Sequence, residues 1–225
     1  MEKNFFIPLL LGMCGVLVLV SLGFWQVHRL SWKQAILSDI DNTITAEPVE
    51  LNLELITRKD QYLPVRAEGQ ILQEEAHVLI SLKTKGAGYR LISVFETLSG
   101  KILLDQGFIS LEHKNKLRVT RRVDVLGNLY WPDEIDSFTP EPDQEKKIWF
   151  ARDIKRIALE LNTKPILLVA RSITPNNSNV MMLPISSVRI PNNHFQYAIT
   201  WFSLAFVWLG MTVYLLWRIR VEKNS

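Results

Sequence analysis

Polar and aromatic side chains are concentrated in two short segments, each next to a long uncharged run. Residues 23–33 read Gly-Phe-Trp-Gln-Val-His-Arg-Leu-Ser-Trp-Lys, and residues 191–202 read Pro-Asn-Asn-His-Phe-Gln-Tyr-Ala-Ile-Thr-Trp-Phe. Amide and imidazole groups at the edge of hydrocarbon need hydrogen-bond partners. A neutral histidine in an aromatic, half-dry pocket is also a suitable axial ligand for haem iron. His28 and His194 both lie in these segments.

The same composition has an ordinary structural explanation. Trp and Tyr form belts at membrane interfaces, and Arg29 and Lys33 can extend toward the headgroups. Asn192 or Asn193, directly after a proline, is a normal helix N-cap. The two segments nevertheless hold more polar groups than anchoring needs, and these are Gln26, Asn193, His194 and Gln196. An anchoring belt and a binding site therefore remain as two interpretations.

Two uncharged runs must position these segments. No Asp, Glu, Lys, Arg or His occurs in residues 5–27 or in residues 195–217. About 20 apolar residues are enough to cross roughly 30 Å of hydrocarbon. We therefore predict two transmembrane helices at 5–27 and 195–217, with a domain at 28–194 between them and a tail at 218–225.

The first run has a second interpretation as a cleaved signal peptide. Ser21-Leu22-Gly23 is loosely compatible with the small residues of a cleavage site. Against cleavage, the run is longer than the apolar core of a signal peptide, about 7–15 residues, and the charges of Glu2 and Lys3 nearly cancel. A retained transmembrane helix is the favoured prediction.

Charge predicts the orientation of the two spans. Arg218, Arg220 and Lys223 follow the second run directly, and cations close to a span favour the cytoplasmic side. Both termini are then cytoplasmic, and the domain lies in the periplasm of a bacterial inner membrane. The single cysteine, Cys14, lies inside the first span, so the domain has no disulfide. A net charge of only +3 gives no support for a nucleic-acid partner.

Between the spans, short strands and turns dominate the pattern. Tyr89–Leu98 and Lys101–Ile109 flank Ser99-Gly100 and predict a hairpin. Further predicted elements are strands at 63–72, 77–82, 118–129 and 165–170, loops at 86–88 and 132–143, and a short helix after Asp153 as its N-cap. The fold class is α+β, mainly antiparallel, for which a partly closed barrel is one arrangement.

Known catalytic and metal-binding motifs do not occur in the sequence. There is no Gly-rich phosphate loop, Cys-x-x-Cys, His-Glu-x-x-His or Gly-x-Ser-x-Gly. His77 and His113 lie among polar residues, which is typical of surface positions. We therefore expect a protein that is not an enzyme. A membrane-anchored enzyme remains an alternative, with Glu134, Asp136 and Glu141 as its candidate carboxylates.

Several motifs carry a resemblance to a known family. The terminal ones are Gly23-x-Trp25-Gln26-x-x-Arg29-x-x-Trp32-Lys33 and Pro191-Asn192-Asn193-His194-x-Gln196-Tyr197-x-x-Thr200-Trp201. The internal ones are Gly88-Tyr89, Leu104-Asp105-Gln106-Gly107-Phe108, Phe138-Thr139-Pro140-Glu141 and Trp149-Phe150-Ala151-Arg152-Asp153. In order and spacing they resemble the surfeit locus protein 1 family nearly from end to end. Gln106 stands where that family usually has an arginine, so a role that depends on this cation is not carried over.

The resemblance implies an assembly factor for haem–copper oxidases of the cytochrome c type, which helps to deliver haem a to the catalytic subunit. It implies His194 as the ligand of the haem iron, with Trp25, Gln26 and Arg29 framing the site from the other span. Arg29 would pair with a propionate, while Trp25, Tyr197 and Trp201 pack on the macrocycle. Residues expected to have structural or interface roles are Gly23, Trp32, Lys33, Asn192, Asn193 and Gln196.

Implied partners are the oxidase catalytic subunit, the haem a synthase and membrane lipid. An alternative keeps the oxidase and discards the cofactor: a scaffold that stabilises an assembly intermediate without binding haem.

Overall fold

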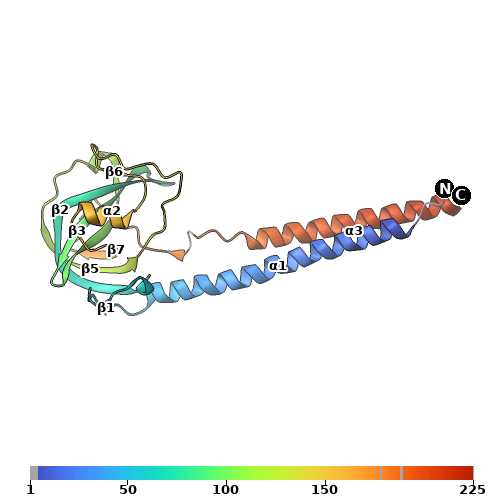
Figure 1. The fold of residues 1–225 in the computed structure, drawn as a ribbon, viewed down its shortest axis with the longest axis horizontal. Helices are drawn as coiled ribbons and strands as arrows, with labels where there is room; N and C mark the ends of the chain where they lie inside the picture. The colour runs from blue at the N-terminus through green and yellow to red at the C-terminus, as the bar shows by residue number, and fades with distance from the viewer. Residues whose placement is uncertain (1–4, 178, 188–189, 225) are drawn as a thin grey trace. The chain divides into compact units, whose positions relative to one another are not determined.

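The computed structural model describes residues 5–177, 179–187 and 190–224 (Figure 1). The chain divides into two compact units. A helix unit consists of Met1–Asp39 and Ser187–Ser225, and a barrel unit consists of Ile40–Ser186. The predicted membrane boundaries at residues 27 and 195 stay predictions, because they depend on where lipid begins.

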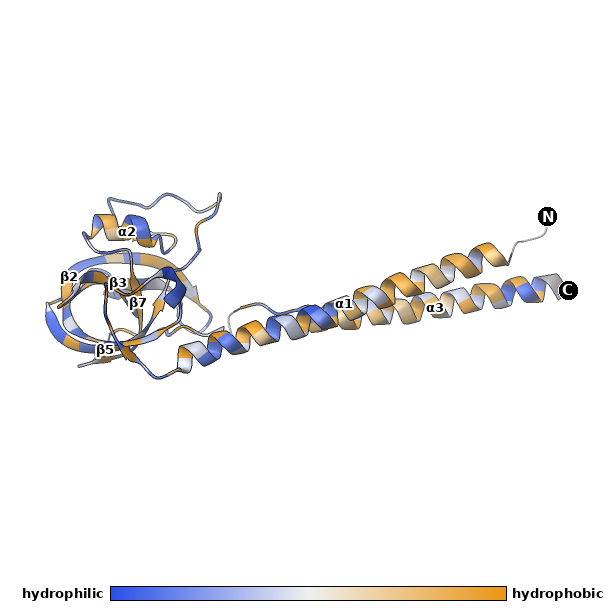
Figure 2. Cartoon of the chain, turned by 60° about the horizontal axis from the view of Figure 1, so that its bottom comes forward, coloured by the Kyte–Doolittle hydropathy of each residue, from blue (hydrophilic) through white to orange (hydrophobic). Residues whose placement is uncertain are grey.

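The helix unit is built from two long apolar helices. α1 runs over Phe6–Thr45 and α3 over His194–Asn224, and they lie side by side in opposite directions (Figure 1). In the described part of the chain, both helices are long and apolar enough to cross a membrane. Figure 2 shows hydrophobic residues along the N-terminal part of α1 and along α3. Most of these side chains are exposed, so neither helix is a buried core helix of a soluble fold. The expectation of two apolar terminal helices is confirmed, and α1 continues well beyond residue 27.

Small residues let the two helices approach closely. A Cβ added to Gly12 would lie 2.1 Å from Thr212 Cγ2, and one added to Gly15 would lie 2.3 Å from Trp208 Nε1. The indole nitrogen of Trp208 donates to the carbonyl of Gly12 at 3.2 Å. Helices in lipid associate through such close packing and interhelical hydrogen bonds, because apolar burial gives them no driving force there.

The barrel unit is a closed ring of five strands with small additions. The ring strands are β2 (Pro64–Leu82), β3 (Gly86–Thr97), β4 (Gly100–Ser110), β7 (Leu167–Thr174) and β5 (Arg121–Tyr130). The additions are β1 (Val49–Glu50), β6 (Ile148–Trp149), α2 (Ile154–Glu160) and the single 3-10 turns η1 (Arg58–Asp60) and η2 (Leu111–His113). Within the ring only β4 and β7 pair in parallel. The expectation of a mainly antiparallel α+β domain is confirmed.

β2 closes the ring because it is long enough to pair with two strands. Its first part, Pro64–Ile71, pairs with β5, and its later part pairs with β3. The register shifts between Ile71 and Glu75, which is a β-bulge that bends the strand from one partner to the other. Barrel closure of this kind removes the exposed edges of a sheet.

Two details of the predicted strands are wrong. The segments 63–72 and 77–82 are one strand, because the polar residues between them occupy the bulge rather than a break. Residues 86–88 are the start of β3 and not a loop. Gly88 is required there by close packing, since an added Cβ would lie 2.4 Å from the carbonyl oxygen of Ile109.

Alternation along the strands sends neighbouring residues to different apolar clusters. Ile102 and Leu104 belong to the cluster inside the ring, whereas Leu103 belongs to the cluster beneath α2. α2 begins as predicted, with the carboxylate of Asp153 accepting from the backbone nitrogen of Arg156 at 3.1 Å. Ile157, which is fully buried, fixes this helix to the outer face of the ring.

Candidate functional site

Gln26 and His194 meet between the two helices of the helix unit. His194 Nδ1 lies 2.8 Å from Gln26 Oε1, and the Gln26 side chain is buried while His194 is half-buried. An amide oxygen only accepts hydrogen bonds, so Nδ1 carries the proton of the neutral ring. The second ring nitrogen, Nε2, then keeps its lone pair. This is how a partner that fixes the tautomer prepares a histidine to ligate a metal.

Close packing of the two helices, one turn before Gln26 on α1, positions the contact between Gln26 and His194. Gly23 is buried, and an added Cβ would lie 2.6 Å from Cε1 of Phe202. Phe24 contacts the same ring edge-on, with centroids 5.5 Å apart. Ala198, also buried, lies between His194 and Phe202 on the same face of α3. Because the two helices approach closely at Gly23 and Ala198, the Gln26 side chain reaches the imidazole of His194.

His194 owes its place to the start of α3. The carbonyl of Asn193 accepts from the backbone nitrogen of Tyr197 at 3.2 Å, which makes Asn193 the N-cap and His194 the first helical residue. Asn192 contributes a buried amide oxygen that has no hydrogen-bond partner among the described residues. A buried acceptor of this kind is costly unless another group completes it.

Arg29 lies one turn beyond Gln26 and stacks on an indole ring. Its guanidinium carbon is 4.5 Å from the ring centroid of Trp32. Within the described residues no carboxylate forms an ion pair with Arg29. The guanidinium is therefore positioned and charged, and it retains donors for an anionic group.

The other predicted site residues lie around this pair without contacting it through their rings. Trp25 and Tyr197 are exposed, and Trp201 is half-buried. Among the described residues, no ring contact joins any of these three to His194. Asn193 and Gln196 are exposed, and Lys33 is half-buried. The structure thus brings Gln26, Gly23 and His194 together, while the roles of the aromatic residues stay predictions.

A buried ion network in the barrel unit was missed by the sequence reasoning. Asp105 accepts from Arg90 and lies 3.7 Å from Nη1 of Arg152, whose guanidinium also binds Glu134. Asp105 is 1% exposed. Arg152 also lies over the ring of Tyr130, 5.0 Å from its centroid. The network attaches the loop before α2 to β3 and β4, which explains in structural terms why an arginine belongs to the central motif.

The candidate carboxylates of the enzyme alternative all have structural partners. Glu134 binds Arg152, and Glu141 accepts from Arg156 at 2.8 Å. Asp136 accepts from the hydroxyl of Thr139 and the backbone nitrogen of Phe138, both at 2.9 Å. These hydrogen bonds lower the pKa of Asp136 below its ordinary value, opposite to what a general acid needs.

The interpretation of His77 as a surface residue is wrong. It is 5% exposed, with Nε2 at 3.1 Å from Glu75 Oε1 and its ring edge-on to Tyr89. Glu75 Oε2 also pairs with Arg118 Nε at 2.9 Å. After the bulge, the three consecutive residues Ala76, His77 and Val78 are all buried, which a strictly alternating strand pattern does not reveal.

Loop attachment by Glu134 is expected to fail in acid. Burial alone would raise the pKa of Glu134, but the hydrogen bonds and charge of Arg152 outweigh it and hold the pKa below its ordinary value of 4.5. A lowered folded-state pKa contributes stability above pH 4.5, and this is lost as the pH falls through the folded pKa. As the pH falls below 4.5, the hydrogen exchange of residues 131–153 is expected to accelerate more than that of β3. Glu134→Gln should remove this pH dependence, and an unchanged profile in the variant would contradict it.

Comparison with known proteins identifies the family. The family model described as the SURF1 family matches residues 13–206. A SURF1-like protein of Rickettsia felis is 30% identical over 202 residues, which cover 84% of this chain and 87% of the relative. Surfeit locus protein 1 of Rattus norvegicus is 28% identical over 91% of this chain and 72% of its own length, and that of Homo sapiens is 27% identical over 82% and 69%. The chain belongs to the SURF1 family, and this membership implies a role in cytochrome oxidase assembly.

Proposed function

We propose that this chain binds haem a transiently during oxidase assembly, with His194 as the iron ligand, and passes it to the catalytic subunit. The hydrogen bond between His194 Nδ1 and Gln26 Oε1 carries the proposal. It holds the imidazole so that Nε2 is the nitrogen that ligates when the ring is neutral, at a depth where two apolar helices limit access of water. In this proposal the protein acts as a carrier, because the Gln26–His194 pair offers an iron ligand whose ring is held in place by a hydrogen bond.

Neighbouring groups fit the rest of a haem. Arg29 retains guanidinium donors that suit a propionate carboxylate. Trp25 and Tyr197 present exposed rings beside the Gln26–His194 pair, and Trp201 is half-buried on the same helix. These faces would pack on the macrocycle. The unsatisfied amide oxygen of Asn192 offers an acceptor for a polar substituent of the ligand.

The same proposal places the protein in a bacterial inner membrane, crossing it twice. Two apolar helices with exposed side chains and relatives in Rickettsia support the membrane assignment. The cations at the C-terminal end of α3 favour cytoplasmic termini, which puts the barrel unit in the periplasm. The haem a synthase and the oxidase catalytic subunit are the partners that such a carrier needs.

Haem occupancy tests the proposal directly. The full chain is purified in detergent from cells that make haem a, and haem is quantified per protein by its absorption spectrum. His194→Ala should lower the occupancy at least about tenfold, since it removes the iron ligand. Gln26→Leu should lower it about 10–100-fold, which is typical when a group that orients a ligand is lost. His28→Ala is the matched control, because His28 is exposed and lies two residues beyond Gln26 on α1, so it points away from the face that carries Gln26.

Equal occupancy in the His194→Ala and His28→Ala proteins would remove His194 from the mechanism. The same strains also test the scaffold alternative, which is favoured by a different observation. Phe138 and Ile135 are 88% and 54% exposed in the loop that Arg152 and Asp136 hold in place, as expected of a protein contact. Under that alternative, no haem co-purifies, and oxidase activity of the membranes survives His194→Ala but not deletion of the chain.

A further inference from the structure

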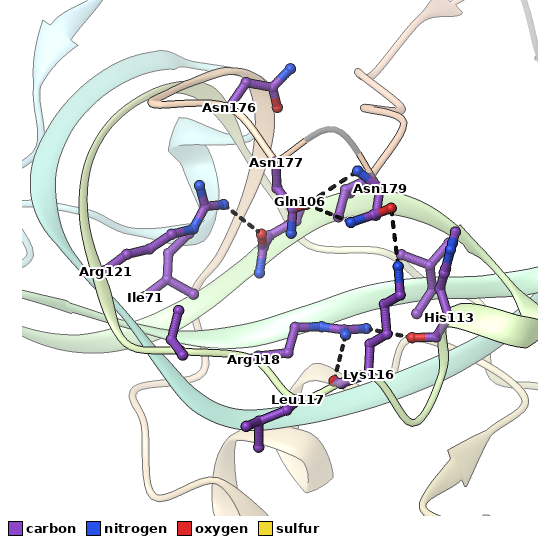
Figure 3. A pocket seen from close by; sticks show the side chains of 13 residues that line it. Ile71, Gln106, His113, Lys116, Leu117, Arg118, Arg121, Asn176, Asn177 and Asn179 are labelled. Atoms are coloured by element: carbon purple, nitrogen blue, oxygen red, sulfur yellow. Dashed lines mark hydrogen bonds between the residues drawn. The ribbon is translucent and has the colours of Figure 1, made fainter.

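A pocket in the barrel unit combines cations, amides and an apolar wall. It has a volume of about 340 Å³ and lies beside β4 and β5, under the segments around Lys116 and Asn177 (Figure 3). All of its lining residues belong to the barrel unit, so it is separate from the Gln26–His194 pair. Its size is in the range of small-molecule sites.

Two cations in this pocket have no counter-charge among the described residues. Arg121 donates to the carbonyl of Pro175 at 2.6 Å and lies 3.4 Å from Gln106 Oε1, and no carboxylate pairs with it. Lys116 donates to Asn179 Oδ1 at 3.3 Å, again with no carboxylate partner. By contrast, Arg118 is neutralised by Glu75. Burial lowers the pKa of Arg121, and no nearby acid offsets this cost.

Both cations keep unused donors. A guanidinium has five N–H groups and an ammonium has three. Within the described residues, Arg121 uses two of its groups and Lys116 uses one. Figure 3 shows Arg121 and Lys116 on opposite sides of the cavity, with the side chains of Gln106 and Asn177 between them. No carboxylate occurs among the lining residues, so no anionic side chain of the pocket lining competes for these donors.

The remaining wall is apolar. Its members come from β2, β4 and the segments that border the pocket, and they are Ile71, Ile109, Leu117, Val119 and Val180. Leu117 and Val119 are 90% and 66% exposed, so they are available to contact a ligand. We propose that this pocket binds a small amphiphilic molecule through an oxyanion group, a carboxylate or a phosphate, that lies between Arg121 and Lys116. This inference does not depend on haem binding.

Short soluble amphiphiles test the proposal. The full chain, held in nanodiscs of zwitterionic lipid, is titrated by calorimetry with hexanoate, hexyl phosphate, hexanol and inorganic phosphate. Hexanoate or hexyl phosphate should bind, more weakly at high salt, and hexanol should not. The tighter of the two anions identifies the class of the natural group. Inorganic phosphate should bind more weakly than hexyl phosphate, because it lacks the part that contacts the apolar wall.

Two matched pairs of variants locate the binding. Arg121→Gln should weaken binding about tenfold, since a charge-assisted hydrogen bond is lost. Arg122→Gln removes the same charge from the next residue of β5, which is exposed and lines a different cavity with Glu68 and Glu96. It should leave binding unchanged. Lys116→Gln should weaken binding about threefold, and Lys146→Gln, an exposed lysine outside the pocket, should not.

Several outcomes would overturn the proposal. Binding of hexanol as tight as that of hexanoate would show a merely apolar cavity. Equal losses in Arg121→Gln and Arg122→Gln would show a diffuse effect of net charge rather than a site. If Arg121→Gln does not fold, the Lys116 and Lys146 pair decides alone, because both side chains reach solvent at the surface.

Discussion

Replacing Asp105 by alanine is expected to lower the free energy of unfolding of the barrel unit by about 3–5 kcal/mol. The Asp105 side chain is fully buried, binds Arg90 and lies 3.7 Å from Arg152. Its other oxygen accepts from the backbone nitrogen of Gly107 at 3.0 Å. Without the carboxylate, two nearly buried guanidinium groups face each other with no charge between them. Single domains are stable by only about 5–15 kcal/mol, so this loss is a large share of the total.

Two further variants separate charge from hydrogen bonding. Asp105→Asn keeps an oxygen for Gly107 and removes only the charge, so it should destabilise less than alanine. Asp124→Ala removes an exposed carboxylate from β5 and should change stability by less than about 0.5 kcal/mol. Urea unfolding of the full chain in detergent, followed by pulse proteolysis, gives the free energies. A loss below 1 kcal/mol in Asp105→Ala would mean that the network is solvated in solution.

Gly107→Ala is expected to cost about 2–5 kcal/mol, the sum of backbone strain and overpacking. Gly107 has φ +120°, where a side chain costs about 1–2 kcal/mol of backbone strain. An added Cβ would also lie 2.2 Å from the carbonyl oxygen of Met181 and 2.7 Å from the Cα of Met182. These are backbone atoms and cannot rotate away, so overpacking adds about 1–3 kcal/mol. The segment around Met181 is held to β4 by hydrogen bonds of 2.7 and 2.9 Å with Phe108 and would have to separate.

Gly86→Ala is the matched control for this prediction. Gly86 also has positive φ, +73°, but an added Cβ would meet nothing within 4 Å. It should therefore show only the strain component, about 1–2 kcal/mol. Hydrogen exchange should report faster opening of residues 179–183 in the Gly107 variant and unchanged exchange there in the Gly86 variant. Equal stability of the two variants would show that the close contact relaxes without cost.

Local sequence patterns predicted the elements whose formation depends on nearby residues. The uncharged runs on either side of the domain gave two long helices, because composition alone makes them too apolar for water. Ser99-Gly100 gave the β3–β4 hairpin, and Asp153 gave the start of α2, since turn and cap chemistry act within a few residues. The motifs near Gln26 and His194 gave two interpretations, an anchoring belt and a binding site, and the sequence did not decide between them.

Contacts between distant segments were not predictable in this way. Ring closure needs β2 to pair with both β3 and β5, and the bulge that allows it is a polar stretch that resembles a break. The buried charges of Arg90, Asp105 and Arg152 resemble surface residues in the sequence, because each is tolerated only through its partners. The pocket cations Lys116 and Arg121 likewise gain their setting from residues about 60 positions away.

The Gln26–His194 pair depends both on local sequence patterns and on contacts between distant segments. The residue types, their place at the borders of the two uncharged runs, and the family resemblance follow from the amino-acid sequence. That the amide oxygen reaches Nδ1 and leaves Nε2 available is visible only from the contact between the two helices. The physical reason is helix rotation: the faces that α1 and α3 turn toward each other are set by packing at Gly12, Gly15 and Gly23 against Thr212, Trp208 and Phe202, residues nearly 200 positions apart.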